Sequence, residues 1–229
     1  MMPVNPEAIG IFGLIATVVC FGLEQIGVGV DENTDHSKLT RTLAHIAIIF
    51  GGTTQIFTSV FMYMFSAAGS HSTYLGTVFG FFGLFWILVG LFFLNGGDKK
   101  VMAHFFACGL LLCIIFTVRA FKDGLIWPLG IDLAVIDLLL FVLVFAWYTG
   151  KPWLTKLAGW CNLAIGFISL FLLLPQLLQR MPRRYLKLLF LNGLHPLVIL
   201  KVPSMMTKPT NRVPSIRSLS LYRAKPASL

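Results

Sequence analysis

Hydrophobic residues in this chain gather into six long runs separated by short polar stretches. An α-helix needs roughly 20 apolar residues to cross about 30 Å of hydrocarbon, and each run has about that length. The runs are continuous and do not alternate between apolar and polar residues, so they favour helices over the strands of a β-barrel. We therefore predict an all-α, polytopic membrane protein with six transmembrane helices, at residues 9–29, 45–65, 75–94, 102–121, 129–148 and 154–178.

The polar stretches divide the chain into a bundle and a tail. Segments such as NGGDKK and YTGKPWLTK are short, so residues 1–178 are predicted to form one six-helix transmembrane domain. Residues 179–229 carry ten of the eighteen Lys and Arg residues and include an amphipathic stretch near 183–200. We expect this tail to lie on the membrane surface or to be disordered. Its predicted partners are anionic membrane lipids and not nucleic acid.

Composition supports an integral membrane protein. Of the 229 residues, 57% are hydrophobic and only 12% are charged. A soluble domain of this size could not bury so much apolar surface. The first apolar run has no Lys or Arg before it and no A-x-A-like site after it, so we expect it to be retained and not cleaved as a signal peptide.

The sequence lacks the motifs of catalysis and of cofactor binding. It contains no G-x-S-x-G, P-loop, dinucleotide fingerprint or H-E-x-x-H. The four cysteines and five histidines lack the spacing of metal ligands. We therefore predict that the protein is not an enzyme and has neither a cofactor nor a metal site.

The first apolar run begins with the unusual segment NPEAIGIFGLI. Asn5 is a preferred helix cap and Pro6 suits the first helical position, so the free N–H groups of this helix end would favour an anion. Gly10, Gly13 and Thr17 recur on one face, where another helix can approach closely. The alternative interpretation is an ordinary cap and ordinary helix packing.

The second run carries an uncharged polar stripe. Gly51, Gln55 and Ser59 stand four residues apart, in a helix that otherwise offers Ile, Phe and Met. Such a stripe can line a water-filled pathway, or it can form hydrogen bonds with neighbouring helices. Both interpretations remain open at this stage.

Acidic residues inside apolar runs are costly in hydrocarbon and therefore informative. Asp137 lies deepest in its run, and we predict it as a protonatable site that couples protons to function. The alternative is a salt bridge from Asp137 to Arg119 or Lys122. Asp132 lies five residues earlier, about 140° around the helix, and we expect it to be an ordinary residue near the lipid headgroups.

Four segments in order resemble the acetate uptake transporter family: NPEAIGIFGL, GGTTQIFTSVFMYMF, GTVFGFFGLFW and FAWYTGKPWLTKLAGW. Together they span roughly residues 5–178. The first is similar to the family signature N-P-A-P-L-G-L, on which Asn5, Pro6 and Gly10 fall, and GGTTQ is similar to G-G-x-x-Q, which contains Gln55. This chain departs from the signature by having Glu7 near the helix entrance.

The resemblance implies a homo-hexamer in the cell membrane, with a separate pathway in each protomer. The implied substrates are small carboxylate anions, such as acetate and succinate, moved with protons by symport or conducted through a channel. Asn5, Pro6, Gly10 and Gln55 would lie at the entrance or along the pathway. Leu14, Phe82 and Ile136 would narrow it, where the family usually has Phe, Tyr and Leu.

Two other functions remain open from the sequence. The same apolar constriction could pass another small solute such as ammonia. The bundle could also be a membrane anchor that transports nothing, with the basic tail recruiting lipids or partners.

Overall fold

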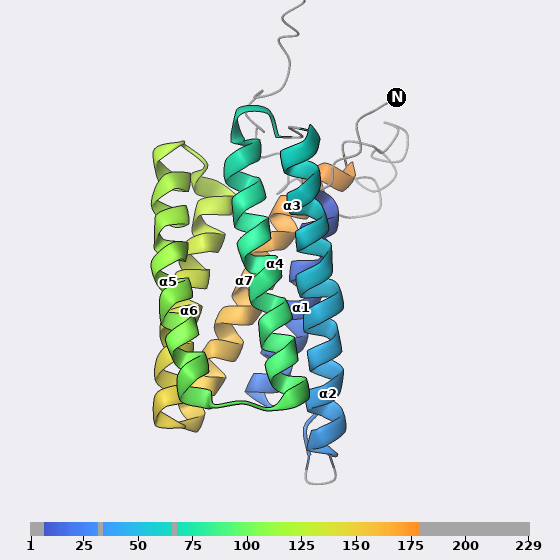
Figure 1. Cartoon of the computed structure of the whole chain (residues 1–229), viewed down its shortest axis with the longest axis vertical. Helices are drawn as coiled ribbons and strands as arrows, with labels where there is room; N and C mark the ends of the chain where they lie inside the picture. Colours follow the sequence, from blue (N-terminus) through green and yellow to red (C-terminus); the bar gives the residue numbers. More distant parts are fainter. Residues whose placement is uncertain (1–6, 32–33, 66–67, 179–229) are drawn as a thin grey trace, which may run out of the picture. The chain divides into compact units, whose positions relative to one another are not determined.

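Six helices long and apolar enough to cross a membrane make up the part of the chain that the computed structural model describes, residues 7–31, 34–65 and 68–178 (Figure 1). The predicted number of spans is confirmed, and the chain is an integral, multi-pass membrane protein. The spans are Glu7–Ile26, His36–Phe65, Gly69–Asn95, Lys99–Lys122, Ile126–Thr149 and Pro152–Gln176. The predicted tail, residues 179–229, lies outside the described residues and stays a prediction.

The helical elements follow one another with short connections. In chain order they are α1 (Glu7–Ile26), α2 (His36–Ile46), the π-helical η1 (Ala47–Thr53), α3 (Thr54–Phe65), the 3-10 turn η2 (Gly69–His71), α4 (Ser72–Asn95), α5 (Lys99–Lys122), the π-helical η3 (Ile126–Gly130), α6 (Ile131–Thr149) and α7 (Pro152–Leu178). The helices α2 and α3 join through η1 into a single long span.

The second span begins nine residues before its predicted start at residue 45, because α2 is polar and therefore invisible to a search for apolar runs. Asp35 caps this helix: its carboxylate accepts hydrogen bonds from the backbone N–H groups of Ser37 (3.1 Å) and Lys38 (3.2 Å). Such a cap satisfies N–H groups that the first helical turn leaves free.

The helices pack in neighbouring pairs, α1 along α7, α3 along α4 and α5 along α6 (Figure 1). Glycines bring the first pair very close together. A Cβ atom at Gly22 would lie 3.0 Å from the carbonyl oxygen of Gly159, and a Cβ atom at Gly159 would lie 3.0 Å from that of Gly22. The backbones of α1 and α7 therefore nearly touch at this point, as small residues allow in membrane helices.

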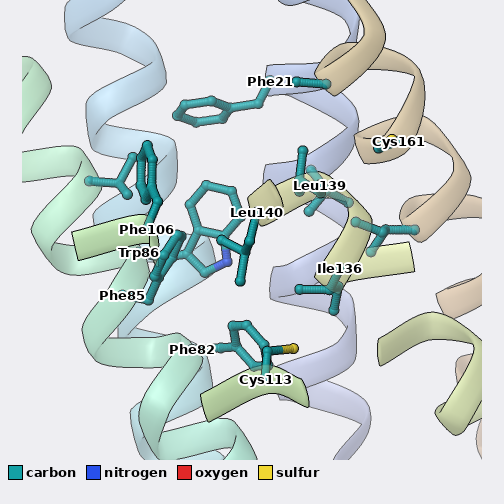
Figure 2. Packing of buried hydrophobic residues seen from close by; sticks show 14 of the residues in the cluster. Phe21, Phe82, Phe85, Trp86, Phe106, Cys113, Ile136, Leu139, Leu140 and Cys161 are labelled. Atoms are coloured by element: carbon teal, nitrogen blue, oxygen red, sulfur yellow. The ribbon is translucent and has the colours of Figure 1, made fainter. Parts of the chain in front are cut away.

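Aromatic side chains fill much of the bundle interior. The ring of Phe85 stacks on Phe105 with centroids 5.4 Å apart and meets Trp86 nearly at right angles at 5.8 Å. Figure 2 shows the aromatic residues of α4 on one side of the interior and the aliphatic residues of α6, such as Ile136 and Leu139, on the other. Offset and edge-to-face ring contacts of this kind stabilise a core beyond simple burial.

Candidate functional site

Two cavities lie inside the bundle, and their lining residues follow one another along α1, α4, α6 and α7. The first, called here the aromatic cavity, has a volume of about 50 Å³ and is lined mainly by Val18, Phe21, Phe85, Trp86, Val89, Phe106, Leu139, Trp147 and Ile165. The second, called the carboxyl cavity, has a volume of about 110 Å³ and includes four polar residues, Glu7, Gln55, Asp132 and Gln176. One water needs roughly 10–15 Å³ of such volume, so the carboxyl cavity has room for a molecule of a few heavy atoms.

Three apolar side chains belong to the lining of both cavities: Leu14 from α1, Phe82 from α4 and Ile136 from α6. They therefore form the boundary between the two spaces. Phe82 and Ile136 are buried, and Figure 2 shows them extending from different helices into the interior. These are the three residues that the family resemblance implied as a constriction, and the fold brings them together.

The boundary is held in place by neighbouring rings. Phe82 meets Phe81 and Phe85 edge to face, with centroids 5.1 Å and 6.4 Å away. Because dense packing limits the side-chain conformations that fit, the ring of Phe82 is restrained from the α4 side. An apolar boundary of this kind can select solutes by width and by dewetting.

Each of the two carboxyl groups that line the carboxyl cavity accepts a hydrogen bond from a residue of α7. The Ser169 hydroxyl donates to Asp132 Oδ2 at 2.7 Å, and Gln176 Nε2 donates to Glu7 Oε2 at 3.1 Å. Asp132 is only 3% exposed. Both pairs join α7 to another helix, so the position of each carboxyl group depends on the packing of α7.

The carboxyl cavity is acidic. Glu7 and Asp132 line it, whereas its described lining contains no Lys, Arg or His. A buried charge without a counter-charge is unfavourable. The cavity therefore suits a molecule that brings a proton or a positive charge with it.

The aromatic cavity has one polar corner. Asn162 Nδ2 donates a hydrogen bond to Gln25 Oε1 at 2.9 Å, and both residues belong to the cavity lining. Asn162 Oδ1 has no hydrogen-bond partner among the described residues. This corner offers an acceptor on the side of the boundary opposite to Asp132.

The other predicted site residues fall in three kinds of place. Asn5 and Pro6 lie outside the described residues. Gly10 is buried where a Cβ atom would come within 2.8 Å of Phe79 and Thr58, so it serves close packing and is not among the residues that line the cavities. Gln55 is 1% exposed and lines the carboxyl cavity, whereas the hydroxyl of Ser59, on the same stripe, donates to the carbonyl oxygen of Gly76 in α4 at 2.6 Å. A pathway role of Gln55 stays a prediction.

Asp137, the predicted proton-coupling residue, belongs to α6 and is in contact with α5. It is half-buried, accepts a hydrogen bond from the Thr117 hydroxyl at 2.7 Å and lines neither cavity. The alternative salt bridge to Arg119 does not form, since Arg119 Nε donates to Asp123 Oδ2 at 2.7 Å. Proton coupling through Asp137 stays a prediction.

Sequence reasoning missed Asp132. The sequence indicates an ordinary residue there, whereas the structure buries the Asp132 carboxyl group against α7. One signal was available: Asp132 stands four residues before Ile136, and residues four apart share a helix face. An acidic residue on the same face as an implied constriction residue is a better pathway candidate than one turned away from it.

Among the described residues, no group of three or more His, Cys, Asp or Glu side chains could hold a metal ion. The fold and the cavities therefore define a class: a polytopic helical membrane protein whose bundle encloses two spaces separated by an apolar boundary.

Within that class, the chain is similar to a solved structure, that of the bacterial acetate channel SatP. The two superpose with a TM-score of 0.63 at 18% sequence identity, over 79% of this chain and 98% of SatP. This chain therefore has the SatP fold, which confirms the family resemblance at the level of architecture. No protein-family model matches the sequence, and no curated protein matches it either.

Proposed function

We propose that this protein is a transporter or channel that lets short-chain carboxylates, acetate first among them, cross a membrane. The observation that carries the proposal is the pair of cavities on either side of Leu14, Phe82 and Ile136, in a fold shared with an acetate channel. Both cavities combine a mostly apolar lining with a few polar groups, as expected for a solute with a polar head and a short hydrocarbon end.

The three boundary residues would control passage. They carry no polar atom in their side chains, so a solute must lose part of its hydration to cross between the cavities. The resemblance implies a tyrosine where this chain has Phe82, and the missing hydroxyl leaves the boundary entirely apolar. We infer that a small, weakly hydrated acid is favoured over a large or doubly charged one, and that succinate is the poorer substrate.

Three further parts of the proposal rest on the family resemblance and on general physics. Protons accompany the substrate, since the carboxyl cavity has no cationic side chain in its described lining to balance an anion.

The chain assembles as a hexamer, with lipid or a neighbouring copy covering the apolar outer surface of each bundle. The membrane is the cell membrane. Size-exclusion chromatography with light scattering would test the hexamer directly.

Uptake of labelled acetate and succinate into proteoliposomes tests the proposal. The purified chain is reconstituted and assayed with and without an inward proton gradient, and protein-free liposomes measure passive entry of the acid. We expect saturable acetate uptake above this background, stimulated by the gradient. Folded, reconstituted protein without such uptake would contradict the proposal.

A second candidate is passage of ammonia or ammonium. The observation in its favour is the acidic carboxyl cavity, in which Glu7 and Asp132 would attract a small cation. Uptake of labelled methylammonium by the same proteoliposomes, with acetate as competitor, separates the candidates. Methylammonium uptake that acetate does not inhibit would favour the second one.

A further inference from the structure

Three polar atoms of residues that line the carboxyl cavity have no hydrogen-bond partner among the described residues: Gln55 Nε2, Asp132 Oδ1 and Gln176 Oε1. Gln55 and Asp132 are more than nine-tenths buried. Buried polar groups in proteins are nearly always paired. A donor and two acceptors around one small space therefore define a binding site for a small molecule that both donates and accepts hydrogen bonds.

Charge narrows the kind of molecule that fits. A carboxylate anion placed beside an ionised Asp132 would meet a like charge, and the described lining of the cavity has no cation to offset the repulsion. A single proton held between the two carboxyl groups removes that repulsion. It also creates a charge-assisted hydrogen bond, which is shorter and stronger than a neutral one.

We propose that the carboxyl cavity binds a small carboxylate together with one proton, shared between Asp132 Oδ1 and an oxygen of the ligand. This inference rests on the carboxylate passage proposed above. Asp132 Oδ1–H donates to one ligand oxygen and Gln55 Nε2–H donates to the other. The Ser169 hydroxyl continues to donate to Asp132 Oδ2 and keeps the carboxyl group oriented.

The shared proton then moves to the ligand. The O–H bond at Asp132 Oδ1 breaks and an O–H bond forms at the ligand oxygen, while the electron pairs stay on the oxygens. A neutral Asp132 and a carboxylate anion become an ionised Asp132 and a neutral carboxylic acid, so the total charge stays at minus one. The neutral acid faces Ile136, one helical turn further along α6, at the boundary between the cavities.

This order of events suits the apolar boundary. A neutral acid loses less hydration on entering apolar surroundings than its anion does. Discharging the ligand at Asp132 therefore lowers the barrier at the adjacent constriction. This proposal assigns proton coupling to Asp132, which lines the carboxyl cavity, and not to Asp137, which does not line it.

Three other titratable side chains of the described residues lie near Asp132 and could in principle hold the proton, so they must be distinguished from it. Glu7 of α1 lines the same cavity, whereas Asp137 of α6 and Cys113 of α5 line neither cavity. In the described chain, α3, α4, α7 and η3 contribute no titratable side chain to the lining of the carboxyl cavity. Asp137→Asn is therefore the matched control for Asp132, and Glu7→Gln tests the other carboxyl group of the same cavity.

Equilibrium binding of labelled acetate to the full chain in nanodiscs, at a series of pH values, tests the proposal. Because one proton enters with each ligand, acetate affinity should fall about tenfold per pH unit on the alkaline side. In Asp132→Asn the side-chain amide still donates to the ligand but does not titrate, so affinity should be independent of pH over that range. Asp137→Asn and Glu7→Gln should keep the wild-type slope.

Any other result of the binding experiment contradicts a specific part of the proposal. A slope retained in Asp132→Asn, or lost in Asp137→Asn or Glu7→Gln, removes the assignment to Asp132. If the acetate affinity of the wild type does not change with pH, no proton is bound together with the ligand. Folded wild type that binds no acetate removes the carboxylate proposal itself and this inference with it.

A second variant covers the case in which Asp132→Asn does not yield a monodisperse protein. Ser169→Ala removes a hydrogen bond that stabilises the ionised form of Asp132. Acetate binding should then persist to higher pH than in the wild type. An unchanged pH profile would overturn the proposal.

Discussion

Asp132 and Ile136 lie one turn apart on α6. Asp132 lines only the carboxyl cavity, whereas Ile136 lines both cavities. One helix thus presents a carboxyl group and, next to it, a side chain of the apolar boundary. Under the proposed function, the group that exchanges a proton is therefore adjacent to the apolar boundary.

Enlarging Ile136 should close the boundary. In Ile136→Trp, an indole would have to fit at the boundary that Ile136 shares with Leu14 and Phe82. An added barrier of about 1.4 kcal/mol reduces a rate roughly tenfold, and we expect acetate uptake to fall by at least that factor. Leu138→Trp is the matched control, because Leu138 is on the same helix and 50% exposed. Equal uptake by the two variants would contradict the role of the boundary.

Adding a methyl group at Gly22 should destabilise the bundle. Its Cβ would meet Leu163 and the carbonyl oxygen of Gly159, and forced overpacking costs about 1–3 kcal/mol. Gly109→Ala is the control, since its Cβ would make ordinary contacts at 3.5 Å or more and alanine favours a helix by up to about 1 kcal/mol. Thermal unfolding in detergent should show a lower midpoint for Gly22→Ala only. Equal midpoints would argue against close contact of α1 and α7.

Asp98 should give the bundle a pH-dependent contribution to stability. Hydrogen bonds from the backbone N–H groups of Val101 and Lys100 lower the pKa of Asp98 below its usual value near 3.8. A carboxyl group with a lowered pKa stabilises the fold above its unfolded pKa, and this stabilisation disappears as the pH falls through the folded pKa. Asp98→Asn keeps a capping side chain but removes the charge.

The unfolding midpoints of wild type and Asp98→Asn should therefore differ at neutral pH and converge below about pH 4. The measurement is thermal unfolding in detergent at a series of pH values, with Lys151→Gln as a surface control that should show no such convergence. A difference between wild type and Asp98→Asn that stays constant with pH would contradict the prediction.

Deleting residues 180–229 should leave transport intact. Among the residues that the structure describes, every one that lines either cavity lies at or before Gln176. Acetate uptake per folded protein should therefore match that of the full chain, provided that size-exclusion chromatography shows the same assembly. Loss of uptake by a properly assembled truncated chain would show that the basic tail is needed for transport.

The sequence predicted the number and positions of the spans because length and apolar composition decide whether a helix can cross a membrane. It missed α2, because the polar face of that segment hides its helical character from a search for apolar runs. Through the family resemblance it also brought together Leu14, Phe82 and Ile136, which come from three helices far apart in the chain.

The sequence did not reveal which acidic residue faces the cavity. Depth along a helix can be counted from residue numbers, and by that count Asp137 is the deeper residue. The direction in which a side chain points depends on which neighbours pack against each face of α6. Thr117 of α5 meets Asp137, whereas Ser169 of α7 meets Asp132 beside the cavity. Only the packed bundle contains this information.

The close packing of α7 against α1 also has a consequence for biosynthesis. Three polar side chains of earlier spans, Gln25, Glu7 and Asp132, each form a hydrogen bond with α7, across 137, 169 and 37 residues of sequence. During synthesis, these groups lack their α7 hydrogen-bond partners until the sixth span has been inserted. The sixth span thus adds the final described wall of both cavities, so that the route between them gains its full described lining only when α7 has been inserted.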